Sequence, residues 1–400
     1  MKKPSALRKS AGLVAAFLLG MSWFSPLQTT LRNMPDTLAL TRSQLTALDG
    51  GALTATASQD ETLGEHQQEL VWSFLGVPLK KVTVEVAEDK RLIPGGMALG
   101  VAMRTEGVLI VGLSDAAEGV ESPAKAAGLQ AGDVIRSVAG SAVTTAEELT
   151  QALHKAGPKP IAIAYQREGQ NRTALLTPYE DTATGAVRLG AWVRDSTAGV
   201  GTLSFYDPDT GRYAALGHAI TDGDTGAVLT VSEGKILRAD VVAVQKGQKG
   251  APGELKGSFL TDAQVLGDIR RNTVLGVYGA LEKPVTSALY PQGLPIGLRS
   301  GVHTGAASIL STVDGGGVQE YAIEITRVNP QSAPAPKSMV IRVTDERLLA
   351  ATGGIVQGMS GSPILQDGRI IGAVTHVFVS DPTQGYGLYV DWMLQESNES

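Results

Sequence analysis

The sequence predicts a mainly β protein, and both its composition and its patterning support this fold class. Glycine occurs 48 times in 400 residues while aromatic residues make up only 5%, a balance typical of short strands joined by turns. From residue 186 onward, apolar runs such as GVGTLSFY and RIIGAVTHVF alternate with turn sequences such as DPDTG and QDG. Many strands with hardly any helix favour one or two barrels over residues 186–396.

The charge and the residue types present exclude several classes of function. The net charge is −6, and Lys and Arg cluster only at the extreme N-terminus, so no surface is predicted that could neutralise nucleic-acid phosphates. Cysteine is absent, which excludes disulfides, thiolate catalysis and thiolate metal sites. We expect no bound metal and no cofactor.

Residues 1–30 are predicted to form a signal or anchor segment. Four basic residues precede the uncharged apolar stretch AGLVAAFLLGMSWFSPL, and no A-x-A-like cleavage site follows it. We therefore favour an uncleaved membrane anchor over a removed signal peptide. The positive charges would keep the N-terminus in the cytoplasm and place the rest of the chain on the outer side.

Residues 31–69 are polar, without a sustained apolar period, and are predicted to form a flexible spacer. A folded domain is expected over residues 70–180, beginning with the alternating strand KVTVEV.

Within that domain, residues 98–176 read as strands around one amphipathic helix, TAEELTQALHKAG, with Thr144 or Thr145 as N-cap. The stretch SPAKAAGLQAGDVI, together with ALGV at 98–101, resembles a PDZ domain in its bacterial arrangement. The resemblance implies that the backbone amides of Leu99, Gly100 and Val101 receive a peptide terminus or an internal turn. The alternative is a domain that only spaces or packs.

Ser360 is the candidate nucleophile. It lies in GMSGSP, a near relative of the GDSGGP that surrounds the nucleophile of chymotrypsin-like proteases. Gly358 allows its own N–H and that of Ser360 to point at one spot, which would form an oxyanion hole. Without other evidence, a Gly-Ser-Pro cluster is more often a simple tight turn.

His218 is the candidate general base among five histidines. It ends the second strand of a hairpin turned by DPDTG, where a side chain can project into a cleft, and imidazole exchanges protons near neutral pH. We expect His66 and His154 to be solvated and His376 to be a core or wall residue, and we assign no role to His303.

Residues 70–394 as a whole resemble the SpoIVB peptidases of endospore-forming bacteria, which are anchored serine proteases with a PDZ domain. The matching stretches are RLIPGG with ALGV, GVGTLSFYDPDTGRYAALGHAI, KGAPGELKG and GGIVQGMSGSPILQDGRIIGAVTHVFV. The resemblance implies a trypsin-like double β-barrel with His218 as base and Ser360 as nucleophile.

The same resemblance makes Asp345, in IRVTDERLL, the third catalytic residue, which would orient His218. Asp222 and Asp224 follow the histidine and could orient it instead, or merely build the turn DGDTG. A structural alternative for Asp345 is an ion pair with a nearby arginine.

The resemblance also implies a signalling role. The enzyme would cut itself in the spacer of residues 31–69, because an extended tether can enter a protease cleft as a strand. It would then cut a membrane-bound regulator of an intramembrane metalloprotease, which leads to activation of a late sporulation sigma factor. It would act between the two forespore membranes. The alternatives are a non-catalytic PDZ-containing ligand or scaffold, and an HtrA-like quality-control protease, although in that group the protease precedes the PDZ domain.

Overall fold

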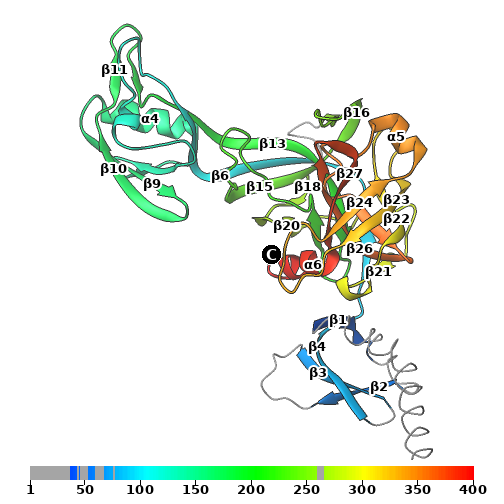
Figure 1. Ribbon diagram of the computed structural model, residues 1–400. Helices are drawn as coiled ribbons and strands as arrows, with labels where there is room; N and C mark the ends of the chain where they lie inside the picture. Colours follow the sequence, from blue (N-terminus) through cyan, green and yellow to red (C-terminus); the bar gives the residue numbers. More distant parts are fainter. Residues whose placement is uncertain (1–36, 43–44, 46–52, 59–66, 75–76, 259–264) are drawn as a thin grey trace, which may run out of the picture. The chain divides into compact units, whose positions relative to one another are not determined.

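The computed structural model describes residues 37–42, 45, 53–58, 67–74, 77–258 and 265–400. The chain divides into two compact units, Met1–Asp89 and Lys90–Ser400 (Figure 1). The predicted anchor, residues 1–30, lies outside the described residues. Among the residues that the structure does describe, no helix combines the length and the apolar character needed to span a bilayer.

The first unit contains a four-stranded sheet with the order β1-β4-β3-β2. The strands are β1 (Thr37–Thr41), β2 (Leu53–Ser58), β3 (Gln67–Phe74) and β4 (Val77–Ala87). Its small core contains Leu70, Trp72, Val82 and Val84, which alternate along β3 and β4 as expected of a half-buried sheet.

The prediction of a flexible spacer over residues 31–69 is therefore wrong for the parts of it that form β1, β2 and the start of β3. Thr37–Thr41 pairs in parallel with β4, and Leu53–Ser58 pairs with β3 in an antiparallel register. Both segments are rich in Thr and Ala, so their strand character depends on partners found further along the chain.

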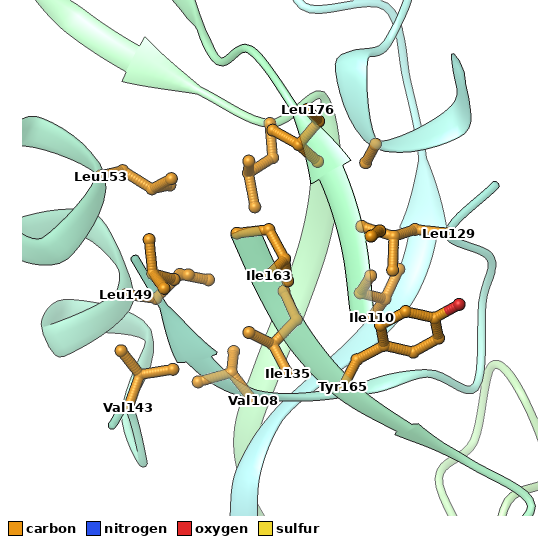
Figure 2. Packing of buried hydrophobic residues seen from close by; sticks show 14 of the residues in the cluster. Val108, Ile110, Leu129, Ile135, Val143, Leu149, Leu153, Ile163, Tyr165 and Leu176 are labelled. Atoms are coloured by element: carbon orange, nitrogen blue, oxygen red, sulfur yellow. The ribbon is translucent and has the colours of Figure 1, made fainter. Parts of the chain in front are cut away.

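The PDZ part of the second unit is a small barrel-like sheet covered by one helix. It comprises the C-terminal half of β6 (Ala98–Leu113), α3 (Pro123–Ala126), β7 (Val134–Val138), β8 (Ser141–Ala142), α4 (Ala146–Ala156), β9 (Ile161–Arg167), β10 (Gln170–Leu176), β11 (Tyr179–Asp181) and β12 (Ala186–Arg188). Leu149 and Leu153 point from α4 onto Ile163 and its neighbours (Figure 2). Thr145 caps α4 in a capping box with Glu148, as one of the two predicted alternatives had it.

Two long strands link the PDZ part to the rest of the unit. β6 pairs with β13 (Ala191–Tyr206) from Leu113↔Ala191 to Ala98↔Thr202, with register shifts on the way (Figure 1). The predicted start of the PDZ domain at residue 70 differs from the division of the chain into units. Residues up to Asp89 belong to the first unit, and the first half of β6 belongs to the peptidase sheet.

The peptidase part has two halves. In the first half, a large sheet joins β13 and β6 to β5, β14, β15 and β18–β21; in the second half, six strands close into a barrel with the order β22-β23-β24-β27-β26-β25. The predicted pair of barrels is thus closed in its second half only, within the described residues.

The remaining elements are β5 (Arg91–Pro94), β14 (Arg212–Ala215), β15 (Val231–Arg238), β16 (Asp240–Gln245), β17 (Glu254–Ser258), β18 (Val265–Asp268), β19 (Arg271–Thr273), β20 (Gly276–Ala280), β21 (Leu294–Pro295), η1 (Arg299–Gly301), β22 (Gly305–Ser311), β23 (Gln319–Val328), β24 (Met339–Val343), α5 (Glu346–Thr352), β25 (Pro363–Gln366), β26 (Arg369–Phe378), β27 (Asp381–Tyr389) and α6 (Val390–Asn398).

Candidate active site

A cavity of about 750 Å³ lies between the two halves of the peptidase part and contains both His218 and Ser360. His218 comes from the segment after β14, and Ser360 from the turn before β25. None of the lining residues is an Asp, Glu, Lys or Arg. The aliphatic members of the lining are Val101, Val200, Leu216, Ile220, Val228, Val274, Ile355, Val356 and Val377.

Ser360 lies in a loop that requires glycine at two positions. Gly358 and Gly361 have φ angles of +94° and +97°, in the region that favours glycine. A Cβ atom on Gly361 would lie 2.1 Å from the carbonyl oxygen of Thr202, so a side chain is also excluded by space. The Ser360 hydroxyl donates a hydrogen bond to the carbonyl oxygen of Thr375 at 2.7 Å.

The backbone N–H groups of this loop divide into two classes. Those of Met359, Gly361 and Ser362 donate to backbone carbonyls at 2.8–3.1 Å. Those of Gly358 and Ser360 donate to no acceptor among the described residues. Because unpaired N–H groups are uncommon in folded proteins, two beside a candidate nucleophile are the donors expected of an oxyanion hole.

The direction of both free N–H groups is set by the carbonyl that precedes each. N–H and C=O point in opposite directions in a trans peptide, so anchoring the carbonyl aims the N–H. The carbonyl of Gln357 accepts from Leu255 N–H at 2.8 Å, and that of Met359 accepts from Ser362 N–H at 3.0 Å. The first contact comes from β17, which belongs to the stretch KGAPGELKG.

His218 is half-buried at the same cavity, and its ring is held by a backbone carbonyl. Its Nδ1 lies 2.8 Å from the carbonyl oxygen of Ala219. A carbonyl can only accept, so Nδ1 carries a proton, and in the neutral ring Nε2 then keeps the lone pair that a general base needs. Burial lowers the pKa of His218, and the hydrogen bond to Ala219 opposes this shift. No hydrogen bond joins His218 to Ser360 in the described structure.

His376 also lines the cavity, in agreement with its prediction as a wall residue. Its ring centroid lies 5.1 Å from that of His218, with the planes tilted by 40°. Burial in the cleft, followed by the nearby His218 and Lys337, lowers the pKa of His376. Its side chain is nevertheless exposed at the cavity mouth, so solvent weakens this shift.

The predicted role of Asp345 finds no support in this geometry and is corrected. Asp345 is the N-cap of α5, accepting from the N–H groups of Arg347 and Leu348, and its second oxygen pairs with the Arg347 guanidinium at 2.8 Å. The Arg347 contact holds the pKa of Asp345 at about 2. Asp345 does not line the cavity and makes no contact with His218. The structural alternative, an ion pair with a nearby arginine, is the one observed.

Asp222 and Asp224 do not orient His218 either. One oxygen of Asp222 accepts from the N–H groups of Asp224 and Thr225, which builds the turn, and the other pairs with Arg194. Asp224 pairs with the same Arg194 at 2.8 Å. The alternative reading of DGDTG as a turn is therefore the observed one.

The predicted peptide-binding role of Leu99, Gly100 and Val101 is wrong. All three lie in the middle of β6, which pairs with β13 on one side and with β15 on the other. Their backbone groups therefore face neighbouring strands on both edges and cannot receive a peptide. Leu99 and Val101 are core residues of the peptidase part, and Val101 also lines the catalytic cavity.

A groove better suited to a peptide lies beside α4. This PDZ groove, of about 240 Å³, is lined by residues of α4, by 114–116 and by 187–193. Ser114 N–H donates to the carbonyl of Gly190 at 3.0 Å, which makes Leu113 and Ala191 a non-hydrogen-bonded pair of the antiparallel ladder. The N–H and C=O of Ala191 therefore point away from β6. The N–H groups of Leu189 and Gly190 have no acceptor among the described residues.

Comparison with protein families decides the identity of the larger part of the chain. The model described as "SpoIVB peptidase S55" matches residues 185–394. The chain belongs to the SpoIVB peptidase family. A PDZ-domain model matches residues 116–167, and no curated protein sequence matches significantly. This member of the SpoIVB peptidase family is a serine endopeptidase with a PDZ domain.

Several solved structures are similar at low identity. The PDZ domain of an SdrC-like protein from Listeria monocytogenes is 22% identical over 22% of this chain and 87% of that chain, with a TM-score of 0.19. The Rv3671c protease from M. tuberculosis in its active form is 16% identical over 50% and 72%, with a TM-score of 0.26. The HtrA-type protease AlgW with a tripeptide is 14% identical over 50% and 54%, with a TM-score of 0.28. Because these scores are low, the assignment rests on the family model and on the site.

Sequence reasoning missed the residues that hold the candidate site in place. The Thr375 carbonyl accepts from the Ser360 hydroxyl, the Leu255 N–H anchors the peptide that carries the Gly358 N–H, and the Ala219 carbonyl holds the His218 ring. All three act through backbone atoms, which leave little signal in side-chain chemistry. The quoted stretch KGAPGELKG was the one available pointer to Leu255.

Proposed function

We propose that Ser360 is the nucleophile of this endopeptidase, His218 its general base, and the N–H groups of Gly358 and Ser360 its oxyanion hole. The observation that carries this proposal is the pair of unpaired N–H groups beside Ser360, in the cavity that also holds a histidine whose Nδ1 is held by a backbone carbonyl. No described residue of that cavity offers a carboxylate or an amine as an alternative base.

The reaction follows from this arrangement. The Ser360 hydroxyl turns about its Cα–Cβ bond from the Thr375 carbonyl toward His218, gives its proton to Nε2, and attacks the scissile carbonyl carbon. The resulting oxyanion accepts from the two N–H groups. Nε2 returns the proton to the leaving amine as the C–N bond breaks, and a water molecule activated by His218 then hydrolyses the acyl-enzyme.

The substrate class is an extended peptide segment with an aliphatic side chain at the cleavage position. The cavity wall carries nine aliphatic residues and no charged Asp, Glu, Lys or Arg. A charged substrate side chain would lose its hydration there without gaining a partner, whereas a Val, Ile or Leu side chain would be stabilised by burial.

A second binding site is proposed at the PDZ groove. A peptide would add as a strand to the edge of β13 that does not pair with β6, with its terminal carboxylate near the N–H groups of Leu189 and Gly190. Trp192, 66% exposed beside the groove, provides a fluorescence signal for binding.

The proposed PDZ groove is tested by titrating C-terminal peptides while following Trp192 emission. Thr150→Arg places a long side chain in the groove and is expected to abolish binding. Gln151→Arg, the next residue on the helix and absent from the groove lining, is the matched control. Equal binding by both variants would place the peptide elsewhere.

We propose that the biological role is sporulation signalling, as membership of the SpoIVB peptidase family supports. The enzyme would be exported or anchored in the forespore membrane facing the intermembrane space. There it would cut itself near the N-terminus and then cut a membrane-bound regulator of an intramembrane metalloprotease, so that a late sigma factor becomes active.

The test is a time course of intact mass and N-terminal analysis on the full chain, with Ser360→Ala and His218→Ala prepared identically. A fluorophosphonate probe, which reacts with activated serines, is added to each protein. We expect the wild type alone to shorten and to be labelled at Ser360. Labelling of the wild type at another serine would overturn the assignment of the nucleophile, and equal shortening of all three proteins would overturn self-cleavage.

A further inference from the structure

Thr202 makes two hydrogen bonds to the loop around Ser360, residues 357–361, although it lies far from that loop in the sequence. It belongs to β13, and its side chain is 1% exposed. Its hydroxyl donates to the carbonyl oxygen of Gly358 at 2.7 Å, and its N–H donates to that of Ser360 at 3.0 Å. The carbonyl oxygen of Thr202 also lies close to Gly361: a Cβ atom added to Gly361 would be 2.1 Å from that oxygen.

The hydroxyl contact holds the peptide that lies between the two oxyanion donors. The peptide joining Gly358 to Met359 is fixed at its carbonyl by Thr202 and at its N–H by the carbonyl of Val356, at 3.1 Å. A glycine with φ near +94° has no Cβ to resist rotation of this peptide. This peptide lies between the N–H groups of Gly358 and Ser360, so its rotation would change the direction of one relative to the other.

Among the described residues, Thr202 is also the only one whose side chain hydrogen-bonds to the backbone of residues 357–361. The other anchors of this loop are backbone groups, which every residue supplies. Thr202 is therefore the position at which a substitution removes one anchor and leaves the others in place.

We propose that Thr202 is a positioning residue of the peptidase, which holds the Gly358–Met359 peptide in the orientation that keeps both oxyanion donors aimed at the cleft. Thr202 touches neither the substrate nor the reacting atoms. The proposal rests on the function proposed above, because it assigns the purpose of the loop to oxyanion binding.

The test compares Thr202→Val, which keeps the shape and removes the hydroxyl, with Thr202→Ser, which keeps the hydroxyl and removes the methyl group. The matched control is Ser204→Ala. Ser204 lies two residues further along β13, is 1% exposed, and its hydroxyl has no hydrogen-bond partner in the described structure.

We expect Thr202→Val to lower kcat about tenfold with KM nearly unchanged, because the lost contact acts on the transition state. The rate of fluorophosphonate labelling should fall by a similar factor. Thr202→Ser and Ser204→Ala should stay within about twofold of the wild type. The kinetic substrate is an internally quenched peptide selected from a random library with the wild-type enzyme.

A second readout does not depend on activity. Hydrogen–deuterium exchange at the amides of Met359 and Gly361 should become faster in Thr202→Val and stay unchanged in Thr202→Ser and Ser204→Ala. A folded Thr202→Val with wild-type kcat and wild-type exchange would overturn the proposal, as would a Thr202→Ser that loses as much as Thr202→Val. If the proposed function failed but the role of Thr202 in the loop held, the wild type would be unlabelled at Ser360 while Thr202→Val still showed faster exchange. The two failures can therefore be told apart.

Discussion

The surroundings of the half-buried His218 side chain determine the pH range in which it can act as the proposed base. The ring loses hydration in the cleft, so its charged form is disfavoured and its pKa falls below the usual 6.5. The Ala219 carbonyl, rather than a carboxylate, holds Nδ1–H, and a neutral acceptor stabilises the imidazolium less than a carboxylate would.

This environment predicts the acidic limb of the pH profile. A general base must be unprotonated, and the lowered pKa of His218 keeps it so below pH 6.5. We expect kcat/KM to fall with an apparent pKa under 6.5 as the pH decreases. The measurement is kcat/KM of the wild type between pH 4 and 8, and a limb centred at or above 6.5 would contradict the buried, carbonyl-bound ring.

Asp345 leads to a prediction about stability. Asp345→Ala removes the N-cap of α5 and should destabilise the protein by about 1 kcal/mol, whereas Asp345→Asn keeps a capping oxygen and should lose less. Because the folded pKa of Asp345 is about 2 against 3.8, its contribution is complete above pH 4 and is lost as the pH falls toward 2.

Urea unfolding of the wild type and both variants at pH 7 and pH 3 measures these differences. The same variants test the corrected catalytic role. If Asp345→Asn lost as much kcat as His218→Ala while remaining folded, Asp345 would act on the histidine in a conformation other than the one described.

At the scale of the element, the loop Gly358–Ser362 is shaped by strands on both sides. β13 supplies Thr202, and β17 supplies Leu255, whose Cβ would lie 3.0 Å from a Cβ on Gly358. The loop is therefore a local motif whose conformation depends on long-range packing.

This packing predicts that Gly361→Ala loses most of its activity. The added methyl group would meet the Thr202 carbonyl at 2.1 Å, and the φ of +97° is unfavourable for alanine. We expect kcat/KM to fall on the order of 100-fold, as when an oxyanion donor is lost. The control is Gly301→Ala, where a Cβ would meet nothing within 4 Å. A Gly361→Ala enzyme with wild-type kcat/KM would show that the loop tolerates another conformation.

The elements also show what the sequence could and could not predict. The motifs GMSGSP and GHAI could be predicted as site motifs because the chemistry of serine and histidine and the backbone freedom of glycine are properties of the residues themselves. The structure brings both motifs to one cavity. ALGV was misassigned because a short apolar run fits a PDZ loop and a buried central strand equally well. The contacts of Thr202 and Leu255 with the loop around Ser360 could not be predicted from the sequence, because strand register decides what these residues contact.

At the scale of the whole molecule, β13 is shared by the two regions of the second unit that we propose to bind peptides. Its first residues, Ala191–Val193, line the PDZ groove, and residues 197–200 line the catalytic cavity. One backbone thus carries both surfaces, and its pairing with β6 extends from one to the other.

The shared strand sets the distance between the two regions. Ala191 and Val200 are nine positions apart on β13, which at ~3.3 Å per residue amounts to ~30 Å of extended chain. A single polypeptide held by its C-terminus in the PDZ groove should therefore be cut only if about ten or more residues separate that terminus from the scissile bond.

A series of peptides with one cleavable site and tethers of increasing length would measure this distance. We expect a threshold in kcat/KM near that length, which disappears in Thr150→Arg. A rate independent of tether length would mean that the two regions of β13 never hold the same chain. A threshold would mean that regulation resides in distance: a partner is chosen by where its end lies relative to its cleavage site, as well as by the residues around that site.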